Sequence, residues 1–198
     1  MSYDSFFKDK HLRFPKDSHA IFSASNYHWL NYDIEKMLEI YAKKVTAREF
    51  GTKMHNLAAM CIELQQPLPD IESTLNMYVN DAISFGMTPE KQLYFSEEFH
   101  GTADSITVDP ENVLRIHDLK TGASRTSLKQ LEIYAALFCL DFGCRPDDFS
   151  GIELRIYQNN DICGETVGVD EIIPIMDKMI TIDKIIRKLK GSNGGIIF

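Results

Sequence analysis

The chain has 198 residues, of which 44% are hydrophobic. This is enough for one sizeable hydrophobic core and too few residues for two, so we expect a single domain over residues 1–198. Within it we expect an N-terminal extension at 1–20 and a flexible tail at 191–198. No apolar run approaches the roughly 20 residues of a membrane span, and the polar N-terminus lacks the apolar core of a secretory signal, so we expect a cytoplasmic protein without a membrane partner. The formal net charge of −8 argues against bulk electrostatic coating of nucleic acid, but it is compatible with an enzyme that gathers carboxylates around a metal ion.

Helical spacing of apolar residues dominates the first part of the chain. The serine pair Ser23 and Ser25 precedes aromatic residues and suits a capped helix start, after which apolar residues recur at helical spacing over 34–41. A second helix is predicted over 49–66, where two prolines end it. A third helical pattern covers 71–85.

Short segments rich in β-forming residues follow, at 91–99, 101–109 and 113–121. The turn-like sequence at 109–112 separates the last two, and we interpret the three segments as strands of a meander. The rest of the chain is predicted as a helix, a strand with a short companion, and a long amphipathic helix, at 127–140, 151–159, 164–169 and 172–189. This order predicts an α/β fold with a single mixed β-sheet, built on the meander and flanked by helices.

Three charged residues lie on neighbouring strands of the predicted meander. Asp118 and Lys120 are two residues apart, so a strand projects their carboxylate and ammonium groups from the same face. Across the hairpin, Asp104 comes close enough to Asp118 for both to hold one cation. Two carboxylates and the main-chain carbonyl of Leu119 suit Mg²⁺, which prefers hard oxygen ligands. Taken alone, the pair fits a second interpretation equally well, in which Asp118 is an ordinary turn residue and Lys120 a solvated surface lysine.

Several motifs in this region resemble a known family. The string GTADSI, a strand ending in HDLKTG, and QLEIY in the next helix follow the core signature of the RecB-type exonuclease branch of the PD-(D/E)XK nucleases. Upstream, FGTKMHNLA is similar to the helix that carries a histidine metal ligand in that branch, which maps to His55. The segment FSASNYHWLNYD is similar to the opening of phage-encoded relatives. The resemblance runs from about Phe22 to about Leu140, with its motifs in order.

The resemblance implies a restriction-endonuclease-like fold and a deoxyribonuclease dependent on Mg²⁺ or Mn²⁺. It implies an exonuclease that acts on linear duplex or single-stranded DNA in phage or mobile-element recombination, repair or defence. The expected metal ligands are His55, Asp104, Asp118 and the carbonyl of Leu119. The expected catalytic residues are Lys120, Asp118, Asp104 and Gln130, where Lys120 orients or stabilises the attacking hydroxide and Gln130 positions DNA or the lysine.

The remaining site candidates carry open alternatives. Tyr134 lies one helical turn after Gln130, on the same face, and either stacks on a base or packs in the core. Glu98 precedes the GTAD strand and is a candidate to support the metal ligands without binding the metal directly. His117 should face away from Asp118 on its strand. Phosphate contacts are candidate roles, beside plain solvation, for Lys53, Arg115, Arg125 and Lys129.

The sequence lacks the cysteine spacing of an iron–sulfur cluster and the motif of an ATP-binding site, and both absences narrow the expected function. Some RecB-type exonucleases hold an iron–sulfur cluster through one early cysteine and three closely spaced late ones, whereas the late cysteines here are widely spread, so we expect no cluster. The chain has no Walker A motif, so we expect no ATP-driven activity, and any unwinding requires a helicase or recombination partner. We expect reduced, partly buried thiols at Cys61, Cys139, Cys144 and Cys163.

Two other functional classes remain open. The first is a non-catalytic module that keeps the nuclease fold to bind a DNA end or to inhibit another protein. A decayed site usually loses its lysine or a metal ligand, and the presence of all four core residues, His55, Asp104, Asp118 and Lys120, argues against this class. The second is an acidic interaction domain that mimics DNA, an interpretation that draws on the net charge of −8.

Overall fold

The computed structural model describes residues 22, 24–122 and 127–191, and it divides the chain into two compact units, 1–49 and 50–198. The described part of the first unit holds the 3₁₀ helix η2 (Ala24–Asn31) and the first half of helix α1 (Ile34–Glu63). The expectation of one domain stays a prediction. The expected extension at 1–20, Ser23 and most of the expected tail lie outside the described residues.

Helix α1 corrects one expectation, because it is a single helix of 30 residues where the pattern predicted two. No proline or glycine-rich turn interrupts the sequence at the expected break, so the backbone hydrogen bonds continue through it. Its second half, from Phe50, belongs to the second unit. None of the described helices is both long enough and apolar enough to cross a lipid bilayer.

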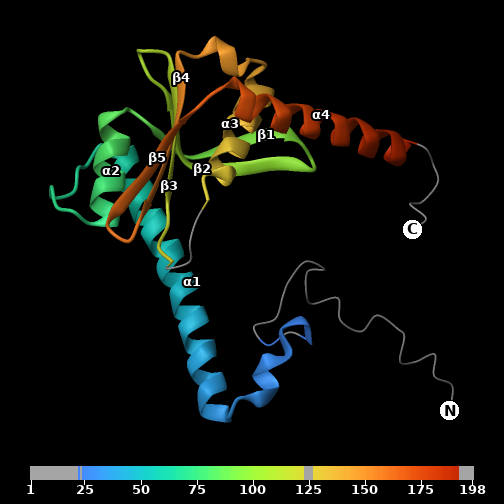
Figure 1. Cartoon of the computed structure of the whole chain (residues 1–198). Coiled ribbons are helices and arrows are strands. Elements are labelled where there is room, and N and C mark those ends of the chain that lie inside the picture. The colour runs from blue at the N-terminus through green and yellow to red at the C-terminus, as the bar shows by residue number, and fades with distance from the viewer. Residues whose placement is uncertain (1–21, 23, 123–126, 192–198) are drawn as a thin grey trace, which may run out of the picture. The chain divides into compact units, whose positions relative to one another are not determined.

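The second unit is built on one five-stranded mixed sheet with the strand order β1-β2-β3-β4-β5 (Figure 1). The predicted meander is confirmed, since β1 (Thr88–Ser96), β2 (Phe99–Val108) and β3 (Val113–Leu119) pair antiparallel in sequence. Strand β4 (Gly151–Gln158) runs parallel to β3, and β5 (Asp161–Val167) pairs antiparallel with β4. The fold is therefore α/β with a single mixed sheet flanked by helices, as the sequence predicts.

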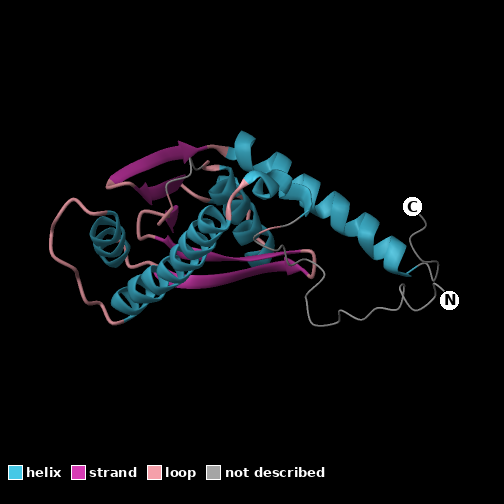
Figure 2. Cartoon of the chain, turned by 90° about the horizontal axis from the view of Figure 1, so that it is seen from below, coloured by secondary structure: helices cyan, strands magenta, loops and turns pink. Residues whose placement is uncertain are grey.

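Helices cover both faces of this sheet (Figure 2). Helix α3 (Lys129–Phe142) connects β3 to β4, as a parallel pair requires, and packs with α4 (Val169–Gly191) over a core that includes Leu114, Ile116 and Leu154. Helix α2 (Thr74–Ser84) and the second half of α1 form a separate core with the far end of β3, at Leu119. The two cores therefore lie on opposite faces of the sheet, with α3 over one and the second half of α1 over the other.

Candidate active site

The candidate site forms where strands β2 and β3 separate. Their ladder ends at the pair Ser105↔His117, so Asp104 and the end of β3 are no longer joined by main-chain hydrogen bonds. The Asp104 side chain bridges the gap, and its Oδ2 accepts a hydrogen bond from the main-chain N–H of Leu119 at 2.8 Å. This contact holds the Asp104 carboxylate beside the end of β3, where the sequence predicts Asp118 and Lys120.

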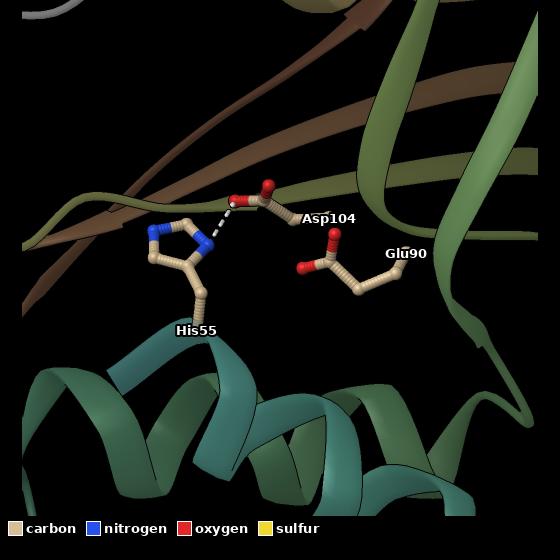
Figure 3. A group of neighbouring side chains, drawn as sticks. All are labelled: His55, Glu90 and Asp104. Atoms are coloured by element: carbon tan, nitrogen blue, oxygen red, sulfur yellow. Dashed lines mark ion pairs between the residues drawn. The ribbon is translucent and has the colours of Figure 1, made fainter. Parts of the chain in front are cut away.

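Three side chains from three elements converge at this point (Figure 3). His55 comes from α1, Glu90 from β1 and Asp104 from β2, and one ligand atom from each lies within 4.8 Å of the others. His55 Nδ1 lies 3.5 Å from Asp104 Oδ2. The three line a hollow of about 470 Å³. One imidazole nitrogen and several carboxylate oxygens are a donor set that suits Mg²⁺ or Mn²⁺.

Glu90 is the residue that the sequence interpretation missed. It directly precedes Lys91, which pairs with Ala103, so it stands opposite Asp104 across the hairpin. A β-bulge near the end of β1 creates this register. Counted from the hairpin turn without that bulge, the register would bring Lys91 opposite Asp104 instead. Glu90 also has a φ of 47°, a left-handed conformation that is uncommon outside glycine and often marks a functional position.

The electrostatics of the site favour a bound cation. A hydrogen bond to Asp104 raises the pKa of His55. Burial, followed by the charge of Asp104, raises the pKa of Glu90 and also that of Asp118. The carboxylates therefore lie close enough to repel one another, and a divalent cation would relieve this repulsion.

Asp118 and Lys120 lie side by side at the end of β3, as their spacing predicts. Lys120 Nζ is 3.0 Å from Asp118 Oδ1 and 2.9 Å from Oδ2. The Asp118 side chain is buried, at 3% exposure, and its Oδ2 accepts no geometrically adequate hydrogen bond among the described residues. Gln130 on α3 accepts a hydrogen bond from Lys120 Nζ at 3.0 Å, so it holds the lysine against the aspartate.

The expected metal ligands are only partly brought together. His55 and Asp104 share the three-residue cluster with Glu90, whereas Asp118 is paired with Lys120. Asp118 is still close enough for the charge of Asp104 to raise its pKa. Leu119 contributes its N–H to Asp104, and the ligand role of its carbonyl stays a prediction.

Tyr134 packs beside the site. A Cβ added at Gly101 would lie 2.9 Å from Tyr134 Cε1, so the ring occupies the space that a side chain at residue 101 would need. Its hydroxyl lies 3.3 Å from Gln130 Nε2 and accepts a hydrogen bond from it. Of the two roles open to Tyr134, the contacts favour packing, with the hydroxyl supporting Gln130.

The other candidates lie around or away from the site. Lys129 pairs with Glu132 at 2.7 Å, and Lys53 is exposed on α1. Arg115 is buried and pairs with Asp109 at 2.8 Å, so a solvated surface role does not fit it. Arg125 falls outside the described residues. Glu98 lies in the turn between β1 and β2 and pairs with Lys190 at 2.7 Å, which places it at the opposite end of the hairpin from Glu90.

Comparisons of this chain with protein-family models, curated proteins and solved structures found no match. Any functional assignment therefore depends on the site geometry and on the motifs that produce it.

Proposed function

We propose that this protein is a DNA nuclease that requires Mg²⁺ or Mn²⁺ and hydrolyses phosphodiester bonds from strand ends. The observation that carries the proposal is the open cluster of His55, Glu90 and Asp104 beside the paired Asp118 and Lys120. The order and spacing of the motifs that resemble RecB-type nucleases support it independently.

The cation would be held by His55, Glu90 and Asp104, with Asp118 near enough to contribute its buried carboxylate. A bound divalent ion neutralises charge on the scissile phosphate and lowers the pKa of a coordinated water. Glu90 gives the site one more acid than the sequence interpretation proposed. A site with this many carboxylates would bind a phosphodiester only weakly without the cation, because like charges repel.

Lys120 supplies the positive charge that the protein itself brings to the reaction. Its ammonium group is fixed by Asp118 on one side and Gln130 on the other, so it needs little reorganisation when charge develops on the phosphate. Asp118 also keeps the lysine at the end of β3 rather than in solvent. In this arrangement Gln130 is a positioning residue that acts through Lys120.

The biological setting follows from the motif resemblance. We place the protein in the cytoplasm, in phage or mobile-element recombination, repair or defence, with a helicase or recombination protein as partner where duplex DNA must be unwound. DNA is the proposed substrate because the resembling family acts on it.

The test is to incubate purified protein with end-labelled linear DNA and with covalently closed circular DNA, in Mg²⁺, Mn²⁺ or EDTA. We expect degradation of linear DNA from its ends, survival of closed circles, and no reaction in EDTA. Cutting of closed circles would contradict the exonuclease assignment and leave the nuclease assignment standing. Binding of DNA ends without any cleavage would favour the non-catalytic module instead.

A further inference from the structure

A second hollow, of about 270 Å³, adjoins Lys120. Phe50 and Met54 of α1 line it together with Leu75 at the start of α2. Leu119 and Lys120 also line it, so the same strand end that carries the catalytic lysine forms one of its walls. Helix α1 connects this hollow to the metal cluster, since Met54 lies one residue before His55 on an adjoining face of the helix.

The hollow presents an exposed aromatic ring. Phe50 is 53% exposed although it sits within reach of other apolar side chains, of which Met54 and Leu75 are half-buried. Burying such a ring against another flat, apolar surface is favourable, and aromatic rings prefer offset stacking or edge contacts. An unpaired nucleobase offers a surface of this kind.

The rim of the hollow is polar and fixed. Asn159 and Asn160 form the turn between β4 and β5, with φ values of 54° and 59° that suit a tight hairpin. Asn160 Oδ1 accepts hydrogen bonds from the N–H of Thr74 at 3.0 Å and from its hydroxyl at 3.2 Å. Those bonds fix the side-chain amide of Asn160 at the rim of the hollow.

We propose that this hollow holds the base and sugar of the nucleotide next to the phosphate that is cut. The proposal rests on the proposed nuclease function, because Lys120 belongs to both sites and a base lies within one nucleotide of the phosphate. The volume is slightly below the roughly 300–1,000 Å³ of pockets for drug-sized ligands, which suits a single nucleoside. Stacking on Phe50 supplies affinity without a strong sequence preference.

This occupant defines the substrate class. A base that enters the hollow must leave its neighbours in the stack and its partner on the other strand, and this costs less in single-stranded DNA than in a duplex. The substrate is therefore a single strand or a frayed end. A blunt duplex should be cut more slowly than a single strand of the same sequence.

The experiment measures single-turnover cleavage of end-labelled single strands that carry either a normal or an abasic nucleotide at each of the terminal positions. At the position next to the cut, loss of the base should slow the wild-type reaction about five- to a hundredfold, the range expected for one stacked base. Phe50→Ala should slow cleavage of the normal strand by a similar factor and make the abasic substitution silent. Phe50→Tyr should restore the sensitivity to the base.

Phe142→Ala is the matched control, because Phe142 is 54% exposed and lies on α3 outside the hollow. It should leave both the rate and the sensitivity to the abasic nucleotide unchanged. Circular dichroism and thermal unfolding of each variant check that it is folded. Equal cleavage of normal and abasic strands by the wild type, or additive effects of Phe50→Ala and the abasic substitution, would overturn the proposal.

A second measurement separates this proposal from the nuclease assignment. Calorimetric titration compares thymidine 5′-monophosphate with deoxyribose 5-phosphate, on wild-type protein and on Phe50→Ala. If thymidine 5′-monophosphate binds more tightly and this preference depends on Phe50, the base-binding role of the hollow is supported even if no DNA is cleaved. In that case only the nuclease function fails. Equal binding of the two ligands, in a protein that does cleave DNA, would refute the base-binding role of the hollow and leave the nuclease function standing.

Discussion

Two polar clusters lie near the end of β3, and they differ in charge balance and in access. In the candidate site, the acids Glu90 and Asp104 open onto a hollow, and the buried Asp118 beside them pairs with Lys120. Behind the same strand, His117 is fully buried, as expected of a residue that faces away from Asp118, and packs against Phe85.

The cluster around His117 is balanced within itself. Arg155 pairs with Asp81 at 3.0 Å, and Tyr157 donates a hydrogen bond to the same carboxylate at 2.6 Å. Burial, together with the charges of Arg155 and Arg115, lowers the pKa of His117 to about 3, whereas Asp104 raises that of His55. The charges of Arg155 and Asp81 offset each other, whereas the candidate site has an excess of acid that a cation would offset.

The largest expected effect comes from Asp118→Asn. This change removes a buried negative charge without changing the shape of the side chain, so the fold should persist while metal affinity and cleavage collapse. Loss of a preorganised electrostatic group costs on the order of a hundred- to a thousandfold in rate. Single-turnover cleavage at saturating Mg²⁺ measures the effect, with Asp177→Asn on the exposed side of α4 as the control. A folded variant with near wild-type rate would show that Asp118 is wrongly assigned.

The two histidines should respond to alanine in opposite ways. His55→Ala should weaken Mn²⁺ binding on the order of tenfold or more, and weaken Mg²⁺ binding less, because imidazole suits the softer ion. His117→Ala should leave metal affinity unchanged and lower the free energy of unfolding by about 2 kcal/mol, through lost packing and unpaired partners. Calorimetry and urea unfolding on both variants measure these effects. Unchanged Mn²⁺ affinity in folded His55→Ala would show that His55 packs in the fold and does not bind the metal.

Gly101→Ala should have a smaller effect that reaches both stability and rate. The added methyl would lie 2.9 Å from Tyr134 Cε1, so the ring must move, at a cost of about 1–3 kcal/mol. Because Tyr134 supports Gln130, cleavage should also fall. Gly151→Ala is the control, since its nearest contacts lie at 4.0 Å. Equal unfolding free energies for the two variants would mean that the Tyr134 ring does not restrict residue 101.

The smallest effect concerns the reactivity of the cysteine thiols. This reactivity measures how deeply each cysteine is buried and does not involve the candidate site. Cys163 is exposed on β5, while Cys139 is buried in the core of α3. Burial raises the pKa of Cys139 to about 12. A short pulse of iodoacetamide at neutral pH, followed by peptide mass spectrometry, should label Cys163 well before Cys139. Faster labelling of Cys139 would contradict the packing of α3 against the sheet.

Part of the site follows from local rules of chain geometry. Asp118 and Lys120 are two residues apart on a strand, so their proximity is fixed once β3 is recognised. Gln130 and Tyr134 share a helix face for a similar reason. Each of these pairs depends on one element only, and the structure places both pairs as the spacing predicts.

Other parts depend on interactions between elements. Glu90 enters the site because a bulge shifts the β1–β2 register by one residue, and no turn motif in the sequence announces that bulge. Glu98 lies in the turn of the same hairpin, at the opposite end from Glu90. The β2–β3 ladder ends before Asp104, whose side chain accepts a hydrogen bond from the N–H of Leu119, and spacing along one strand does not predict where such a ladder ends.

In the proposed mechanism, acids and His55 hold the metal while Lys120 acts on the phosphate, so Lys120→Ala should separate metal binding from turnover. Mn²⁺ affinity by calorimetry and single-turnover cleavage of linear single-stranded DNA are measured on the same preparation, with Lys178→Ala as the exposed control. We predict that Lys120→Ala binds Mn²⁺ at least as tightly as the wild type, because a nearby positive charge is gone, and cleaves at least about a hundredfold more slowly. Near wild-type cleavage by the folded variant, or a wild-type protein that neither binds Mn²⁺ nor cleaves DNA, would contradict the account.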